Sequence, residues 1–155
     1  QSGLGVGDLA LACEENYGDL GVRTEEGWQG GEVIGIPVLD GDVVRYNNFP
    51  LDGAWVQQAA AILPDARVGP FVTVQECSGT DALGLERGER FGALCENMEG
   101  AAAAHLCALY GVPFVEVRVM SNIVEKRDRE QWDLPLAVER AQAAALQLLE
   151  QGLCA

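Results

Sequence analysis

Short runs of β-branched and apolar residues alternate along this chain with segments that favour helix, and this alternation constrains the fold more than any other feature. Such an exchange is typical of an α/β protein in which helices cover a central sheet. The strand patterns lie at residues 6–13, 71–75 and 114–120, and the helix patterns lie at 54–63, 98–110 and 133–151. We therefore expect one α/β domain with helices packed on a central sheet.

Residues with strong terminal preferences mark the ends of the expected helices. Asp52 precedes the first helix and Asn97 precedes the second, which is rich in alanine; both are favoured N-cap residues. Asp133 with Pro135 begins the last helix, and Gly152 ends it. Each helix therefore has a defined beginning in the sequence.

Two further stretches are less regular. Residues 14–21 (EENYGDLG) are expected to form an acidic loop after the first strand. Its carboxylates either make a solvated surface, which we favour, or contact a substrate. Residues 32–38 form a second short apolar run, which ends at Pro37 and a turn at 40–42.

The charge balance excludes several classes of function. The 155 residues include 10 Lys and Arg against 24 Asp and Glu, a net charge of −14. Such a chain repels phosphate backbones and anionic lipid, and no apolar run approaches the length of a membrane span. Five cysteines without a CxxC pair, and no secretory signal, indicate reduced thiols. We expect a cytoplasmic protein that binds neither nucleic acid nor membrane.

The commoner cofactor motifs are absent or misplaced. The glycines at 3, 5 and 7 precede a strand, whereas a dinucleotide-binding loop follows one. The turn at 40–42 lacks the remaining ligands of a calcium loop. The single histidine, His105, has no second histidine or CxxC with which to bind zinc. We expect His105 to be hydrogen-bonded in or beside the core rather than catalytic, and we expect no metal and no organic cofactor.

Residues 96–128 carry the strongest indication of a site. Glu99 lies at the start of the alanine-rich helix, where the helix dipole favours an ionised carboxylate. Asn122 lies just past the end of the strand at 114–120, and ligands of open α/β sheets bind beyond the carboxyl ends of strands. The two side chains could converge on one small polar ligand. On spacing alone, a simpler interpretation is favoured, in which Glu99 only stabilises the helix terminus and Asn122 only forms a turn.

The same stretch resembles the nucleoside phosphorylase/nucleosidase superfamily. The residues that carry the resemblance are Met98-Glu99-Gly100-Ala101-Ala102, His105, GVPF at 111–114, Arg118 and Ser121-Asn122. The stretches at 6–13, 17–21, 69–74, 78–80 and 122–128, together with Trp132, resemble one branch of it, the futalosine hydrolases of menaquinone biosynthesis. The resemblance implies a three-layer nucleoside phosphorylase-like fold, an α/β fold with a mixed central sheet flanked by helices. It covers nearly the whole chain.

The resemblance implies roles on the ribose side of a nucleoside site. Glu99 would bind the two ribose hydroxyls, and an ionised carboxylate there would favour positive charge at C1′. Met98 would lie against the apolar face of the sugar. Arg118 would either support Glu99 or belong to a buried structural ion pair.

The resemblance also implies roles on the base side. Asn122 stands where adenine-specific members have Asp, and Ser121 would orient it. An amide offers two N–H donors, which suit N7 and O6 of a 6-oxopurine. The segment 76–78, with Glu76 and Cys77, would line the base pocket. Asn122 therefore favours hypoxanthine or guanine as the leaving base.

The reaction implied is hydrolysis of an N-glycosidic bond, with futalosine giving hypoxanthine and dehypoxanthine futalosine. The alternatives are a purine nucleoside phosphorylase, a methylthioadenosine/S-adenosylhomocysteine nucleosidase, or a protein that binds a nucleoside without cleaving it. By the same resemblance, residues 1–155 form the carboxy-terminal two-thirds of a single domain. An amino-terminal segment of the same protein would complete it and supply the water-activating carboxylate. Family members commonly form homo-oligomers, which we also expect here.

Overall fold

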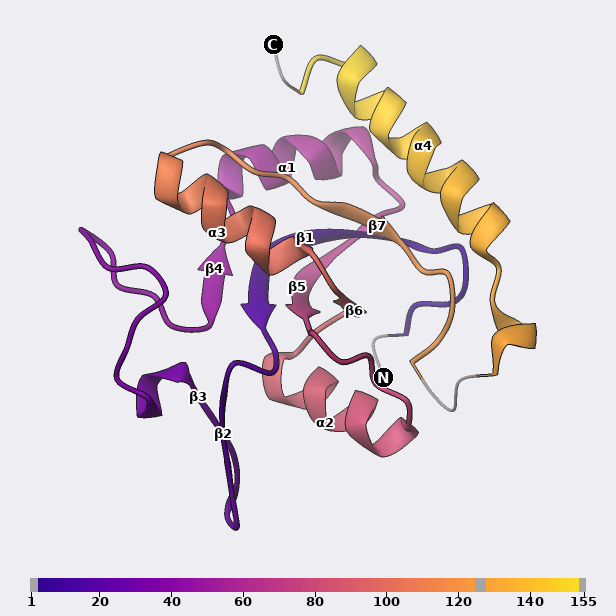
Figure 1. Cartoon of the computed structure of the whole chain (residues 1–155). Helices are drawn as coiled ribbons and strands as arrows, with labels where there is room; N and C mark the ends of the chain where they lie inside the picture. The colour runs from indigo at the N-terminus through magenta and orange to yellow at the C-terminus, as the bar shows by residue number, and fades with distance from the viewer. Residues whose placement is uncertain (1–2, 125–127, 154–155) are drawn as a thin grey trace.

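A mixed five-stranded sheet lies at the centre of the computed structural model, which describes residues 3–124 and 128–153. Three strands run parallel in the order β1, β5, β6, and β4 and β7 pair antiparallel with opposite ends of β1 (Figure 1). The strands are β1 (Leu9–Tyr17), β4 (Asn48–Pro50), β5 (Arg67–Thr73), β6 (Cys95–Asn97) and β7 (Val117–Val119). The expected fold class, a mixed sheet flanked by helices, is confirmed.

The first strand is longer than its apolar pattern indicates. A register shift between Ala12 and Glu14 lets β1 continue to Tyr17, paired with β5 on one side and β4 on the other. The expected acidic loop at 14–21 is therefore wrong for its first four residues. Glu15 is fully buried, because the bonds that β1 makes to both neighbours place this side chain inside the molecule.

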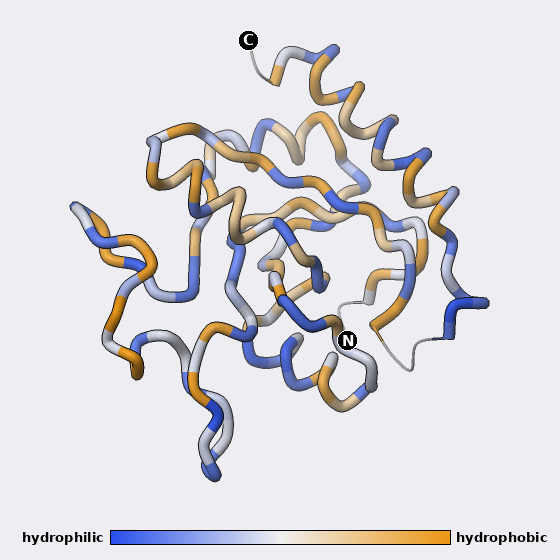
Figure 2. Tube along the Cα trace, viewed as in Figure 1, coloured by the Kyte–Doolittle hydropathy of each residue, from blue (hydrophilic) through white to orange (hydrophobic). Residues whose placement is uncertain are grey.

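The helices begin close to their expected caps. The helices are α1 (Gly53–Ile62), α2 (Asp81–Phe91), α3 (Gly100–Tyr110) and α4 (Leu134–Glu150). The Asp52 carboxylate accepts hydrogen bonds from the first turn of α1, and Asp133 does the same for α4. Thr80 caps α2, which the sequence pattern missed together with β6. Figure 2 shows why, since the α2 segment is largely hydrophilic beside the apolar strands.

The helices pack on the sheet around two apolar clusters. Leu11 of β1 packs with residues of α1 and α4, which lie side by side (Figure 1). Ala10 and Ala12, which alternate with Leu11, pack with Phe71 and Met120 in a second cluster. α3 contacts β1, β4 and β5, and α2 contacts β5 and β6. These contacts fix the starts of α2 and α3 close to the ends of β5 and β6.

The segment between β1 and β4 projects from the sheet. It holds a hairpin of β2 (Gly21–Thr24) and β3 (Gly27–Gly30), then a 3-10 turn at Gly31–Val33 (Figure 1). The apolar run at 32–38 does not enter the core, and Ile36 is 72% exposed. Within the described residues, no helix is both long and apolar enough to cross a membrane.

Candidate functional site

The corner between β6 and α3 presents Met98 and Glu99 at the surface. The Asn97 side-chain oxygen accepts hydrogen bonds from the backbone N–H of Glu99 (3.0 Å) and of Gly100 (2.7 Å). The expected helix start is wrong, because α3 begins at Gly100 and its N-cap residue is Glu99, although Asn97 still supplies an acceptor to this first turn. Because both residues precede the helix, their side chains point away from its packed face, and both are exposed.

Glu99 is held by a cation from a different element. Its carboxylate lies 3.2 Å from Nη2 of Arg118 on β7, and 74% of the Glu99 side chain is exposed. Arg118 also donates through Nε to Oε1 of Glu116, at 2.5 Å. Arg118 therefore makes both of the contacts that were considered for it. It contacts Glu99, and it also forms an ion pair with the buried Glu116. A ligand that reaches Glu99 meets a carboxylate that is already oriented.

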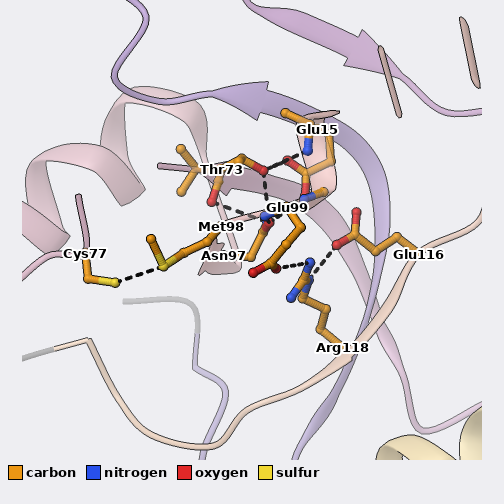
Figure 3. A network of polar contacts seen from close by, with 11 residues as sticks. Glu15, Thr73, Cys77, Asn97, Met98, Glu99, Glu116 and Arg118 are labelled. Atoms are coloured by element: carbon orange, nitrogen blue, oxygen red, sulfur yellow. Dashed lines mark hydrogen bonds and ion pairs between the residues drawn. The ribbon is translucent and has the colours of Figure 1, made fainter. Parts of the chain in front are cut away.

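A buried polar cluster lies directly beneath this corner (Figure 3). Glu15 accepts hydrogen bonds from the Thr73 hydroxyl (2.8 Å) and from the Asn97 amide (2.6 Å). Burial raises the pKa of Glu15 to about 8, and the neighbouring charge and carboxyl of Glu116 add to the rise. Glu15 is therefore a neutral carboxylic acid at neutral pH.

The predicted base reader lies in the loop after β7. The Ser121 hydroxyl is 2.8 Å from the Asn122 side-chain oxygen, and Asn122 Nδ2 donates to the carbonyl oxygen of Ile123 at 3.0 Å. The Ser121 contact that the resemblance implies is thus present. Among the described residues, these contacts leave the second N–H of Asn122 available for a ligand.

The geometric reason that we expected for the convergence of Glu99 and Asn122 is wrong. β7 runs antiparallel to β1, so its carboxyl end lies at the opposite end of the sheet from those of β5 and β6. The loop that follows β7 passes close to α2 instead, where a Cβ on Gly84 would lie 2.5 Å from Val124. This packing brings the Asn122 loop beside the helix that follows the segment 76–78.

Of Glu76 and Cys77, the two residues predicted to line the base pocket, Cys77 contacts Met98. The Cys77 thiol lies 3.3 Å from the Met98 sulfur (Figure 3). The Glu76 side chain is exposed, whereas its carbonyl oxygen accepts a hydrogen bond from Arg87 at 2.7 Å. Arg87 therefore fixes the backbone of this segment, and Cys77 is the residue that faces the Met98 corner.

Sequence reasoning missed the residues that support the site from below. The sequence pattern predicts a solvated loop at Glu15 and a strand at Glu116, with no site role for Glu116. One signal was available, because Glu116 and Arg118 are two residues apart in a strand and so share a face. No local signal links Glu15 to either residue, since β1 meets them only in the folded sheet.

The single histidine packs beside the core, and the described cysteines are free thiols. His105 is half-buried, with Nδ1 3.2 Å from the Tyr17 hydroxyl and its ring stacked on Phe49, as expected for a histidine beside the core. Four described cysteines, at 13, 77, 95 and 107, are free thiols. Cys154, like residues 125–127 of the resembling stretch, lies outside the described residues.

Comparison with known proteins gives a consistent relationship. The family model of the phosphorylase superfamily matches residues 1–151. The futalosine hydrolase of Acidothermus cellulolyticus is 34% identical over 145 residues, which are 90% of this chain and 56% of that protein. The futalosine hydrolase of Thermus thermophilus is also 34% identical, over 97% of this chain and 65% of that protein. The chain thus spans between about half and two thirds of the length of these relatives.

Solved structures of low identity share the fold. The S-adenosylhomocysteine nucleosidase from Streptococcus pyogenes, in complex with 5-methylthiotubericidin, matches with a TM-score of 0.78 at 21% identity, over 98% of this chain and 63% of that one. The futalosine hydrolase of Helicobacter pylori strain 26695 matches with a TM-score of 0.77 at 15% identity, over 96% of this chain and 62% of that one. Together with the family match over nearly its full length, these findings establish that the chain belongs to the phosphorylase superfamily.

Proposed function

We propose that the protein containing this chain hydrolyses the N-glycosidic bond of a 6-oxopurine nucleoside, with futalosine as the substrate. The observation that carries this proposal is the exposed Glu99 carboxylate, oriented by Arg118 at the corner before α3. Futalosine hydrolases are among the relatives at 34% identity. The proposed reaction forms hypoxanthine and the remaining sugar derivative, as part of menaquinone biosynthesis in the cytoplasm.

Glu99 would act on the sugar. An ionised carboxylate that accepts two hydroxyl hydrogen bonds holds the ribose and stabilises the positive charge that develops as the bond to the base lengthens. The Arg118 contact holds Glu99 in place. Met98 would cover the apolar face of the sugar from the same corner, with Cys77 behind it.

Asn122 would act on the base. Its available N–H would donate to N7 or O6 of a 6-oxopurine and stabilise the negative charge that builds on the leaving base. The contact with Ser121 supports this role, because it turns the amide oxygen toward Ser121. An adenine would instead present an amino group to a donor and leave both unpaired, which gives strong discrimination. The activation of water is assigned to no residue of this chain.

Exchange of Asn122 for Asp tests the base assignment in the intact protein. We expect Asn122→Asp to lower kcat/KM for futalosine or inosine by about two orders of magnitude, equivalent to about 3 kcal/mol. Hypoxanthine release, followed by coupling to xanthine oxidase, measures this. Asn48→Asp on β4, which pairs with the opposite end of β1 from β7, is the matched control and should retain activity. Equal activity of Asn122→Asp and the wild type would remove Asn122 from the site.

The same assay separates the alternative functions. Turnover that requires inorganic phosphate would identify a phosphorylase, and a preference for methylthioadenosine would identify an adenine-specific nucleosidase. Saturable binding of futalosine without release of hypoxanthine would identify a binding protein. Hydrolysis of futalosine in phosphate-free buffer is the result that we expect. We also propose that the protein forms a homo-oligomer and that residues beyond this chain complete the domain.

A further inference from the structure

Two carboxyl groups, those of Glu15 and Glu116, meet beneath the Met98–Glu99 corner. A Cβ on Gly100 would lie 2.1 Å from Oε1 of Glu15 and 2.5 Å from Oε2 of Glu116. Both oxygens therefore lie within 2.5 Å of one point. Glu15 is 0% exposed and Glu116 is 7% exposed. Two anions cannot remain this close in a buried site, so one of the two groups carries a proton.

The hydrogen bonds around the pair show where that proton resides. Oε2 of Glu116 is buried and has no donor among the described residues if both groups are ionised. Its other oxygen, Oε1, accepts a hydrogen bond from Nε of Arg118. A proton on Glu15 supplies the donor that Oε2 of Glu116 lacks. Glu15 can provide it while still accepting from Thr73 and Asn97.

The pair is connected to the proposed ribose carboxylate by one continuous set of contacts. Glu116 binds Nε of Arg118, and Nη2 of the same guanidinium binds Glu99 (Figure 3). The guanidinium is rigid and planar, so the position of Glu116 determines where its other nitrogen points. We propose that Glu15 and Glu116 share a single proton, and that this pair positions Arg118 and, through it, Glu99. Glu15 and Glu116 are positioning residues, and the second half of this proposal rests on the proposed function.

Loss of the proton changes the geometry. When Glu15 ionises, two adjacent negative charges repel each other, and Glu116 can no longer stay beside Glu15 and hold Arg118 in the same place. The other groups that act on the pair are Arg118, Glu99, Cys95 and Tyr17. Burial raises the pKa of both the Cys95 thiol and the Tyr17 hydroxyl, so both stay neutral while Glu15 titrates.

Glu116→Gln is the variant that removes the shared proton and preserves the shape. A glutamine amide can donate to Oε1 of Glu15, and its oxygen can accept from Arg118, so each hydrogen bond has a donor and an acceptor. Because Glu116 no longer contributes a charge or a carboxyl group, the pKa of Glu15 is expected to fall, although burial still raises it above its ordinary value. Glu15→Gln is a poorer choice, because an amide N–H there would face the Asn97 amide. Glu14→Gln, the same exchange one residue earlier on β1, is the matched control.

Infrared spectroscopy of the intact protein tests the proton directly. We expect the carbonyl band of a buried carboxylic acid at pH 7 in the wild type and in Glu14→Gln, and a weaker band in Glu116→Gln that disappears at a lower pH. Absence of the band in the wild type, or the same pH dependence of the band in Glu116→Gln, would overturn the proposal. This measurement needs no substrate, so it stands if the protein hydrolyses no nucleoside and the proposed function fails.

The pH dependence of KM for futalosine tests the positioning. In the wild type we expect KM to rise about three- to tenfold between pH 7 and 9, with a smaller change in kcat, because Glu99 loses its orientation. In Glu116→Gln, KM should be nearly constant over this range, and Glu14→Gln should behave as the wild type. A KM profile that is identical in the wild type and in Glu116→Gln would overturn the positioning role.

Discussion

Two glutamates near the Met98–Glu99 corner, the buried Glu15 and the largely covered Glu96, are neutralised in different ways. Glu96 on β6 accepts from Arg87 at 3.2 Å, from the Ser78 backbone N–H at 2.7 Å and from the Ser78 hydroxyl at 2.6 Å. Glu15 on β1 faces another carboxyl and is neutralised by a proton. The difference shows that burial alone does not predict the charge of a carboxyl group, since the partner across from it decides.

The two arrangements have different purposes in the fold. The Arg87–Glu96 ion pair ties α2 to β6, and Arg87 also bonds the segment 76–78. The Glu15 cluster joins β1, β5, β6 and α3 through neutral and charged hydrogen bonds. Its state changes at mildly alkaline pH. The next experiments test this contrast, in order of decreasing effect on stability.

Filling the space between the two carboxyl groups should have the largest effect. Gly100→Ala places a methyl group 2.1 Å from Oε1 of Glu15, and neither carboxyl group can move without losing buried hydrogen bonds. We expect a loss of more than about 5 kcal/mol in the free energy of unfolding, measured in urea. Gly88→Ala on α2, with nothing within 4 Å of the added Cβ, should stabilise by about 0.5 to 1 kcal/mol. A small effect at Gly100 would contradict the close approach of the carboxyl groups.

Removal of the cation from the Glu96 site should have the next largest effect. Arg87→Met leaves the Glu96 carboxylate buried beside Ser78 without a countercharge, and it removes the bond to the Glu76 carbonyl oxygen. We expect a loss of about 3 to 5 kcal/mol in urea denaturation. Arg23→Met, at an exposed ion pair with Glu86, is the control and should change stability little. If the two variants were equally stable, the Glu96 ion pair would contribute nothing to the fold.

The pH dependence of the free energy of unfolding tests how Glu15 is neutralised. The pKa of Glu15 is raised from 4.5 to about 8 in the folded protein, so its contribution to stability is complete below pH 4.5. That contribution falls as the pH rises and is lost above pH 8. In Glu116→Gln, the decrease in the free energy of unfolding between pH 5 and 8 should be smaller by about 1 to 2 kcal/mol. The reason is that the charge and the carboxyl of Glu116 no longer raise the Glu15 pKa. Urea denaturation at several pH values measures this, and parallel curves for the two proteins would exclude a shared proton.

The sequence predicted those parts of the fold that depend on local pattern. Helices with polar caps and apolar faces, such as the one after Asp52, begin where their residues indicate. The pattern failed at α2, where glycines and charged residues hide the helix, and at Glu15, where a strand continues through acidic residues. Both depend on partners distant in sequence, because α2 is anchored by the Arg87–Glu96 ion pair and Glu15 by Thr73 and Asn97.

In the candidate site, too, local pattern identifies some residues, whereas contacts between distant parts of the sequence determine the rest. Glu99 and Asn122 could be singled out from the sequence, since each lies at the end of a predictable element. The support for Glu99 could not, because Arg118 reaches it from a strand 19 positions away. Residue spacing also does not predict the antiparallel direction of β7, because the direction of a strand is determined by the whole sheet. Residue types at element ends are thus predictable, whereas the contacts that orient them come from the topology.

The smallest effect on stability should come from Glu99 itself. Its side chain is 74% exposed, and its ion pair with Arg118 is open to solvent. We therefore expect Glu99→Gln to change the free energy of unfolding by less than about 0.5 kcal/mol, while kcat/KM for futalosine in the intact protein falls by at least about tenfold because the ribose loses a charged acceptor. Glu89→Gln, an exposed residue on α2, should change neither quantity. A Glu99→Gln protein that unfolds readily would show that this carboxylate holds the corner together, and it would then resemble Glu96 rather than a group kept available for a ligand.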